Sequence, residues 1–144
     1  MIRVTCTYRF SASHRLHAPG LSDSENAELY GKCNNPYGHG HNYVIEVSAR
    51  GPVEERSGRA LDPHTLDRLV KEQVLEPFDQ QNLNTGSTIF EELVPTTENL
   101  AREIYRRLAV SWPSAFPGAW PVLEKVRIAE TPRNIFEVSG HVQT

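Results

Sequence analysis

The clearest structural signal in the chain is the stretch HGHNYVIEVSARG, residues 39–51, which alternates between two kinds of side chain. One face of this stretch carries His39, His41, Tyr43, Ile45, Val47 and Ala49. A period of two predicts a half-buried strand whose apolar face lies on a core. The two histidines therefore begin the inward face of a strand.

The same alternation occurs in IRVTCTYRFSASH, residues 2–14, and it places His14 at the end of the inward face of a second strand. Between these two strands, the polar connection of residues 19–36 is typical of a functional loop or a disordered segment. Residues 122–130 and 134–142 resemble two further strands joined by a TPRN turn.

Two helices are expected in the middle of the chain. The first covers residues 61–78, with Asp62 as N-cap and Pro63 at the first helical position. The second follows PTTEN, where a threonine caps a helix whose apolar residues are spaced by four. The proline- and aromatic-rich SWPSAFPGAWP, residues 111–121, is expected to be a loop.

The order strand, strand, helix, helix, strand, strand predicts an α+β fold in which a four-stranded antiparallel sheet carries both helices on one face. With 144 residues, the chain is expected to be a single domain over residues 1–144. An open sheet has two edges that must be paired or protected, so a homo-oligomer is expected.

Composition excludes several classes of protein. A formal net charge of −3 leaves no basic footprint, so nucleic acid is not an expected partner. The start of the chain, MIRVTCTYRF, has charges among its apolar positions, which argues against a signal peptide and a membrane span. Two cysteines do not make a disulfide scaffold, and the expected location is the cytoplasm.

The strand-starting histidines also suggest a metal site. His39 and His41 are one residue apart, so their Cα atoms lie about 7 Å apart on one side of a strand. Both imidazoles can then bind one ion, although the pair is also compatible with two surface histidines. Antiparallel pairing of the first two strands brings His14 to the same place, and His17 is the alternative third ligand. Three histidines leave an open fourth position.

Cys33 precedes this pair by six residues and lies in the polar connection. It has two interpretations. As a fourth zinc ligand it would close the site, which would then be structural. As a thiolate beside an open site it would be catalytic, and the positive charges of Lys32 and of the metal would favour the thiolate form.

Five separated motifs, in the order SASHRLH, LSDSEN, GKCNNPYGHGHNY, VPTTEN and AETPRNI, resemble the 6-pyruvoyltetrahydropterin synthases over nearly the whole chain. That family shares its tunnelling fold and much of its chemistry with the 6-carboxytetrahydropterin synthases of queuosine biosynthesis. The long spacing between Cys33 and His39 is closer to the pyruvoyl branch.

The resemblance implies a zinc ion bound by His14, His39 and His41, with Cys33 as the general base. It also implies a lyase that converts 7,8-dihydroneopterin triphosphate to 6-pyruvoyltetrahydropterin while triphosphate is eliminated. The expected assembly is a hexamer made of two trimers, in which each trimer closes its sheets into a barrel.

The remaining site residues follow partly from the resemblance and partly from charge. Glu130 matches the pterin anchor of the family, and a carboxylate can accept two parallel hydrogen bonds from the pterin ring. Thr96 and Thr97 match residues that line the pterin pocket. On charge alone, Arg15 and Lys32 are candidates for holding the triphosphate, as is Arg133.

One segment departs from the family pattern. FDQQNLN keeps the catalytic aspartate as Asp79, but Gln80 stands where the family has histidine. An amide does not titrate near neutral pH and cannot relay a proton. Two alternatives therefore remain: an enzyme of the same fold with another product (6-carboxytetrahydropterin or a hydroxymethyl dihydropterin), or a zinc- and pterin-binding protein with impaired turnover.

Overall fold

The computed structural model describes residues 1–140 of the chain. Its elements, in chain order, are β1 (Ile2–His14), α1 (Asp23–Tyr30), η1 (Gly31–Asn34), β2 (His39–Gly51), α2 (Pro63–Val70), η2 (Lys71–Leu75), α3 (Glu76–Phe78), β3 (Gln81–Asn82), α4 (Leu83–Gly86), η3 (Thr88–Glu91), α5 (Thr97–Ala115), β4 (Val122–Thr131) and β5 (Asn134–Ser139). The fold is α+β, as predicted.

The two predicted N-terminal strands have the predicted bounds. β1 and β2 pair antiparallel along their whole length, from Ile2 opposite Gly51 to His14 opposite His39. β4 and β5 extend the sheet antiparallel on the other side of β2. The C-terminal strand ends at Ser139, and the last part of the predicted range 134–142 lies outside the described residues.

The sheet has five strands in the order β3-β1-β2-β4-β5, so the expectation of four antiparallel strands is wrong. β3 is parallel to β1, where Ala12 and Ser13 are its partners. Asp79 and Gln80, the two residues before β3, hold the chain beside β1 through hydrogen bonds to Ser11. The Gln80 N–H donates to the Ser11 carbonyl at 2.6 Å, and the Asp79 carboxylate accepts from the Ser11 N–H at 2.9 Å.

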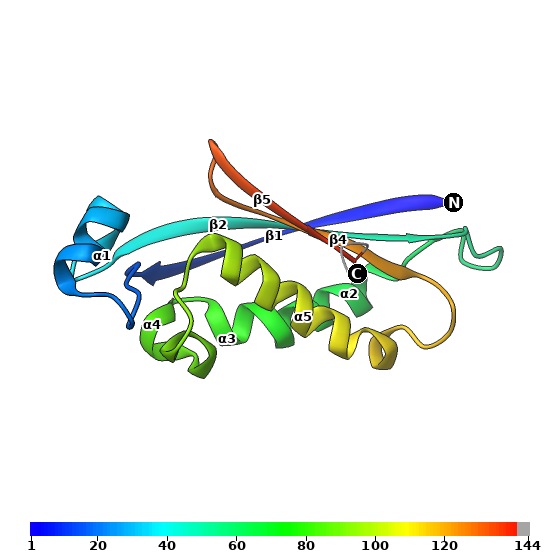
Figure 1. The fold of residues 1–144 in the computed structure, drawn as a ribbon. Helices are drawn as coiled ribbons and strands as arrows, with labels where there is room; N and C mark the ends of the chain where they lie inside the picture. Colours follow the sequence, from blue (N-terminus) through cyan, green and yellow to red (C-terminus); the bar gives the residue numbers. More distant parts are fainter. Residues whose placement is uncertain (141–144) are drawn as a thin grey trace.

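Helices α2 to α5 lie against one face of the sheet, as the sequence predicts for its two helices (Figure 1). The core between the layers includes Phe10, Tyr43, Ile45, Val47, Leu66, Val70, Phe78, Leu100, Ile104, Leu108, Val126 and Ile128. The inward faces of β1 and β2 supply part of this core, because alternate residues of a strand share a face.

Both predicted helix starts are confirmed. The Asp62 carboxylate accepts from the His64 N–H at 3.1 Å and caps α2, and the Thr96 hydroxyl accepts from the Asn99 N–H at 3.2 Å and caps α5. The first helical stretch continues through η2 and α3 as far as Phe78. Each cap supplies a partner to an N–H that has none inside the helix.

Two segments expected to lack structure contain helix. α5 continues to Ala115 through Pro113, because Trp112 is buried against Phe116 and its indole N–H donates to the Pro121 carbonyl at 2.9 Å. In the connection of residues 19–36, α1 forms with a reciprocal capping box between Ser22 and Glu25.

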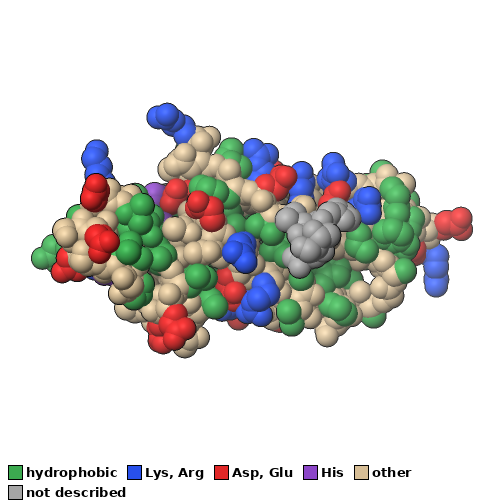
Figure 2. Space-filling view, in the orientation of Figure 1, with side chains coloured by type: hydrophobic (Ala, Val, Ile, Leu, Met, Phe, Trp, Pro, Cys, Tyr) green, Lys and Arg blue, Asp and Glu red, His purple; other side chains and the backbone are tan. Residues whose placement is uncertain are grey.

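Basic and acidic side chains are interspersed on the face of the molecule shown in Figure 2. This mixture agrees with the absence of a basic footprint in the composition. Within residues 1–140, no helix has the length and apolar character needed to cross a membrane.

Candidate functional site

The three predicted histidines meet where β1 ends and β2 begins. One ligand atom from each of His14, His39 and His41 lies within 4.8 Å of the others. The register explains this meeting, because His14 is opposite His39 and His41 follows two residues later on the same face. The group can hold a metal ion, and the register of β1 against β2 brings its three histidines together.

The tautomer of His14 suits a metal ligand. His14 is 1% exposed, and its Nδ1 lies 2.8 Å from the Pro95 carbonyl oxygen. A carbonyl can only accept, so Nδ1 carries the proton and Nε2 presents its lone pair to the other rings. A hydrogen bond from the outer nitrogen of a ligating histidine is the usual support of a metal site.

Burial favours the neutral form of His14 and His39. Burial lowers the pKa of His14, which the hydrogen bond to Pro95 opposes, and the positive charges of the other two histidines would lower it further. Burial also lowers the pKa of His39, with a contribution from His41. Neutral imidazole is the form that binds metal.

The nitrogen spacing also fits a metal. His14 Nε2 and His39 Nε2 are 3.1 Å apart, while two nitrogens at 2.0–2.1 Å from one tetrahedral ion lie about 3.3 Å apart. Without an ion, His14 Nε2 can accept a hydrogen bond from His39 Nε2, and a cation bound by both nitrogens would take the place of that proton. The donor set therefore fits a divalent ion that accepts nitrogen ligands.

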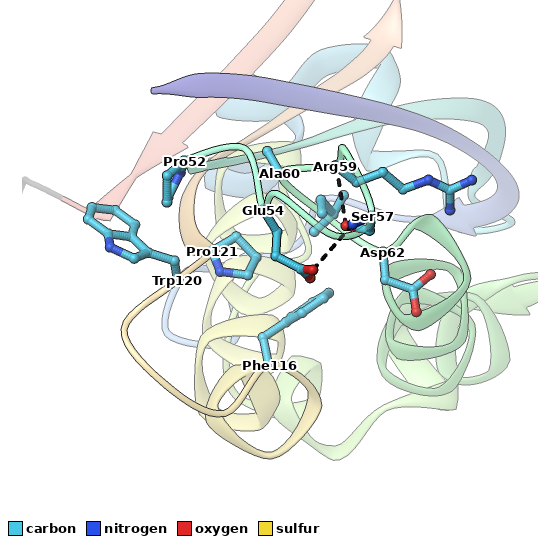
Figure 3. Close-up of a pocket in the computed structure, with 10 residues that line it drawn as sticks. Pro52, Glu54, Ser57, Arg59, Ala60, Asp62, Phe116, Trp120 and Pro121 are labelled. Atoms are coloured by element: carbon cyan, nitrogen blue, oxygen red, sulfur yellow. Dashed lines mark hydrogen bonds between the residues drawn. The ribbon is translucent and has the colours of Figure 1, made fainter.

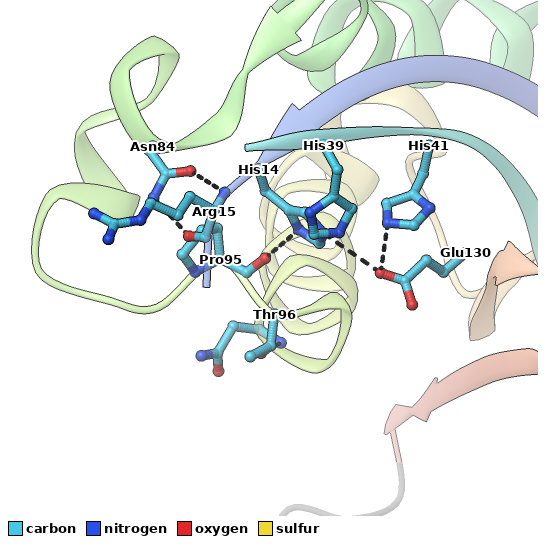
Figure 4. Close-up of polar contacts among 9 residues, drawn as sticks. His14, Arg15, His39, His41, Asn84, Pro95, Thr96 and Glu130 are labelled. Atoms are coloured by element: carbon cyan, nitrogen blue, oxygen red, sulfur yellow. Dashed lines mark hydrogen bonds and ion pairs between the residues drawn. The ribbon is translucent and has the colours of Figure 1, made fainter. Parts of the chain in front are cut away.

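Glu130 points into the same group from β4 (Figure 4). Its Oε1 lies 3.5 Å from His14 Nε2 and 3.3 Å from His41 Nε2. The register of β4 against β5 shifts between Ala129 and Thr131, so Glu130 sits at an irregularity of the hairpin. Such irregularities re-aim side chains beside functional sites. The carboxylate thus lies within ion-pairing distance of two of the three rings.

Buried polar atoms without a hydrogen-bond partner gather at this end of the sheet. Among the side chains of the described residues they are His41 Nε2, Tyr43 OH, Thr97 Oγ1 and, elsewhere in the sheet, Arg50 Nε. Burial raises the pKa of Tyr43, and the charge of Glu130 adds to the effect, so this phenol is a neutral donor near neutral pH. Sequence reasoning placed Tyr43 on the inward face but gave it no function.

Cys33 is not part of the three-histidine group. It lies on η1, is partly exposed and free, and its carbonyl accepts from the Leu16 N–H at 2.8 Å. Gly38 allows the chain to return to β2, because its φ is +72° and a Cβ there would lie 3.0 Å from the His14 carbonyl oxygen. These two contacts hold the segment from Cys33 to Gly38 against the end of β1.

His17, the alternative third ligand, is engaged elsewhere. Its Nδ1 lies 3.1 Å from the Asn34 side-chain nitrogen, and Asn34 also donates to the Leu16 carbonyl at 2.7 Å. Asn26 is fully buried and accepts from the Ala18 N–H at 2.6 Å. These two asparagines organise the loop around η1, a role that the sequence pattern did not indicate.

The candidate phosphate-binding cations lie on the loops. Arg15 donates through Nε to the Asn34 carbonyl at 3.0 Å, and its backbone is held on both sides by the Asn84 side chain, at 2.7 and 2.9 Å. In Figure 4 its guanidinium points away from the three rings. Lys32 is exposed on η1, and Arg133 is exposed in the β4–β5 turn.

Asp79 and Gln80 lie at the edge of the sheet beside β1. The Asp79 carboxylate oxygen that accepts from Ser11 is also 3.5 Å from the Gln80 side-chain nitrogen. Gln80 has a φ of 61°, a left-handed conformation that is uncommon for a residue with a Cβ. Within one chain, this pair is attached to β1 and is not part of the histidine group.

A cavity lies at the opposite end of the sheet from the histidines, between the loop after β2 and the end of α5 (Figure 3). Its polar groups have local structural uses. Glu54 accepts from the Ser57 N–H at 3.3 Å, and Asp62 caps α2. Three of the four unpartnered atoms and the histidine cluster are at the other end of the sheet, which is therefore the candidate functional site.

Comparison with known proteins agrees with this geometry. The family model "6-pyruvoyl tetrahydropterin synthase" matches residues 3–141. A 6-pyruvoyl tetrahydrobiopterin synthase of Poecilia reticulata is 42% identical over 95% of this chain and 89% of its own, and that of Homo sapiens is 40% identical over 91% and 86%. The solved structure of Caenorhabditis elegans 6-pyruvoyl tetrahydropterin synthase has a TM-score of 0.87 at 42% identity, covering 96% of this chain and 95% of that one. The chain therefore belongs to the 6-pyruvoyl tetrahydropterin synthase family.

Proposed function

We propose that this protein is a zinc-dependent lyase that converts 7,8-dihydroneopterin triphosphate to 6-pyruvoyltetrahydropterin and triphosphate. The observation that carries the proposal is the group of His14, His39 and His41, with the Glu130 carboxylate on its open side. The names of the relatives supply the product class. Three neutral imidazoles with one free position are a common zinc donor set for catalysis.

The three histidines would hold the zinc, which supplies Lewis-acid polarisation to the side chain of the substrate. The task of His14 is positional, because Pro95 fixes its tautomer and its ring orientation. The product carries a more reduced ring and a more oxidised side chain than the substrate. The reaction is therefore an internal redox rearrangement that needs proton transfers and no nicotinamide.

Glu130 anchors the ring in this proposal. A carboxylate accepts two parallel hydrogen bonds from the pterin amino group and the adjacent ring N–H. Such a pairing fixes the orientation of the ring and places its side chain beside the histidines. The start of α5 is connected to this space through Pro95, which precedes the helix cap and whose carbonyl contacts His14, and through the buried Thr97 near Tyr43.

Cys33 is the proposed base. Its sulfur would take a proton from a carbon of the substrate side chain, and the base need not be a metal ligand to do so. The cysteine lies outside the histidine group, on a short helix tied to the end of β1. Arg15 and Lys32 would attract the triphosphate through their charge.

Gln80 favours a second candidate, a zinc- and pterin-binding protein with slow turnover. The chain has Asp79 at the position of the family's catalytic aspartate, but the next residue, which would relay the proton, is Gln80, whose amide cannot titrate. Its carboxylate accepts from the Ser11 backbone, which also gives Asp79 a structural use. The two candidates share the same binding site and differ only in turnover.

Product analysis separates the candidates. The zinc-loaded protein is incubated with 7,8-dihydroneopterin triphosphate, and the products are identified by mass spectrometry. The proposed lyase gives 6-pyruvoyltetrahydropterin and free triphosphate. A 6-carboxytetrahydropterin or hydroxymethyl product would assign the chain to another reaction of the same fold, and unchanged bound substrate would support the binding protein.

A further inference from the structure

Two buried hydroxyls at this end of the sheet make no well-formed hydrogen bond among the described residues. Tyr43 is 0% exposed and Thr97 is 2% exposed, and their two side-chain oxygens lie near each other without adequate hydrogen-bond geometry. The great majority of buried polar atoms in proteins have a partner. Two exceptions on one face of one site indicate groups that are satisfied only when something else is bound.

The register places Tyr43 against Glu130. The last pair of β2 with β4 is Val44 opposite Ala129, so Tyr43 and Glu130 are the residues that follow this pair at the end of the paired region. The two side chains share the helix-facing side of the sheet, because Tyr43 is part of the core and Glu130 contacts His14 and His41. Thr97 approaches from the first turn of α5 on that same side.

Glu130 has a reason to move toward these hydroxyls. Its Oε1 lies at the nitrogens of His14 and His41 that a metal would use. His14 Nε2 cannot donate to the carboxylate, because the ring proton is on Nδ1, and a cation bound to His41 Nε2 removes that nitrogen as a donor as well. The carboxylate must then find other donors. Tyr43 and Thr97 interact with each other only weakly, and a hydroxyl that accepts from its neighbour still has its own proton to donate.

We propose that Tyr43 is a positioning residue for Glu130: its hydroxyl, together with that of Thr97, donates to the carboxylate and aims it at the pterin ring. This inference rests on the proposed function, because it requires Glu130 to bind the ring. A carboxylate has about four lone-pair sites, so it can accept two bonds from the pterin and one from each hydroxyl. The carboxylate is then saturated by donors without the histidines.

The test measures binding of 7,8-dihydroneopterin, which lacks the triphosphate that would be eliminated, to the zinc-loaded full chain by titration calorimetry. Tyr43→Phe removes only the hydroxyl, and we expect it to raise the Kd by about tenfold or more, the usual effect of losing a hydrogen bond to a charged group. In a Glu130→Gln background the same change should raise the Kd by less than about threefold, because the charged acceptor is gone.

The folding readout separates positioning from a structural role. In the metal-free protein the Tyr43 hydroxyl makes no well-formed hydrogen bond, so Tyr43→Phe should leave the thermal midpoint nearly unchanged or raise it. Tyr8→Phe is the matched control on the same face of the sheet, since the Tyr8 hydroxyl donates to Asp67 at 2.7 Å. That control should lower the midpoint and leave the pterin Kd unchanged.

A second pair of variants tests the other donor. Thr97→Val should weaken pterin binding, and Thr97→Ser should restore it, because serine keeps the hydroxyl. An equal loss from Tyr43→Phe in both Glu130 backgrounds, or no loss in the wild-type background, would overturn the inference. Failure of the wild-type protein to bind 7,8-dihydroneopterin at all would instead overturn the proposed function.

Discussion

The surroundings of His14 and His39 determine whether these two rings are protonated. The Pro95 carbonyl accepts from His14 Nδ1, which leaves Nε2 free for a metal, and burial lowers the pKa of both His14 and His39. The folded protein therefore resists protonation of these rings more strongly than the unfolded chain does. This difference makes its stability depend on pH.

The sign of that dependence follows from linkage. Unfolded imidazoles titrate near 6.5, so below this pH the unfolded chain binds more protons than the folded one. The free energy of unfolding of the metal-free protein should fall as the pH is lowered from 6.5, and these two groups should add no pH dependence well above that value.

Thermal unfolding of the chelator-treated protein across this range measures the effect. His39→Gln should flatten part of the slope, whereas His64→Gln, at an exposed position on α2, should leave it unchanged. Equal slopes for the wild type and His39→Gln would contradict the role given to burial.

Gln80 is the residue most expected to limit the rate. Gln80→His restores a titrating group beside Asp79, whose carboxylate is 3.5 Å from the present amide nitrogen and can orient a new ring. A general acid–base group contributes about 10²–10⁴-fold to rate. We expect the variant to speed single-turnover product formation by a factor in this range at neutral pH, with little change in substrate Kd.

Asn is the matched control for that variant, because Gln80→Asn keeps an amide and should not raise the rate. His17 and His64 are the other histidines that could relay the proton. A wild-type protein that is already fast, and that gains nothing from Gln80→His, would show that this chain moves its protons by another route.

At the scale of elements, the first turn of α5 connects helix stability to the site. Thr96 caps the helix through the Asn99 N–H, while its neighbour Pro95 accepts from His14 and its neighbour Thr97 lies near Tyr43. Thr96→Ala should lower the free energy of unfolding by about 1 kcal/mol and also weaken zinc affinity, because the Pro95 carbonyl loses its fixed position.

Asp62→Ala removes a comparable cap from α2, far from the histidines, and should cost a similar amount of stability without changing zinc affinity. Denaturant unfolding and zinc competition with a chelating dye measure the two quantities. Equal weakening of zinc binding by both variants would mean that the effect is one of overall stability.

Strong local patterns made β1, β2 and the starts of α2 and α5 predictable. Alternation over thirteen residues gave both long strands their bounds, and Asp62 and Thr96 marked the helix starts. β3 has only two residues, and its parallel pairing depends on contacts of Asp79 and Gln80 with Ser11 that are distant in sequence. No local pattern encodes such a contact.

The end of α5 illustrates the same limit. Pro113 and the aromatic residues around it favoured a loop by local preference, but burial of Trp112 and Phe116 extends the helix to Ala115. Tertiary packing overrides local propensity in this way. For the site, the histidine spacing predicted the metal group. The contact of Pro95 with His14 and the position of Tyr43 near Glu130 depend on the three-dimensional arrangement of β2, β4 and the start of α5, which no local pattern predicts.

At the scale of the whole molecule, the described residues 1–140 leave both edges of the sheet largely unpaired. Among these residues β1 pairs with β3 only at Ala12 and Ser13, and β5 ends the sheet on the other side. Long unpaired edges invite association. We expect light scattering on a sizing column to give a mass that is a multiple of three chains, in line with the proposed trimers, and a monomer at micromolar concentration would contradict this.

In the proposed site, three histidines hold the metal and leave a fourth position open, and Cys33 lies outside. The zinc content of purified variants, determined by atomic emission, tests this arrangement. We expect about one zinc per chain in the wild type and in Cys33→Ala, and little zinc in His39→Ala or His41→Ala. Loss of zinc from Cys33→Ala would show that the cysteine is a ligand and would contradict the open site.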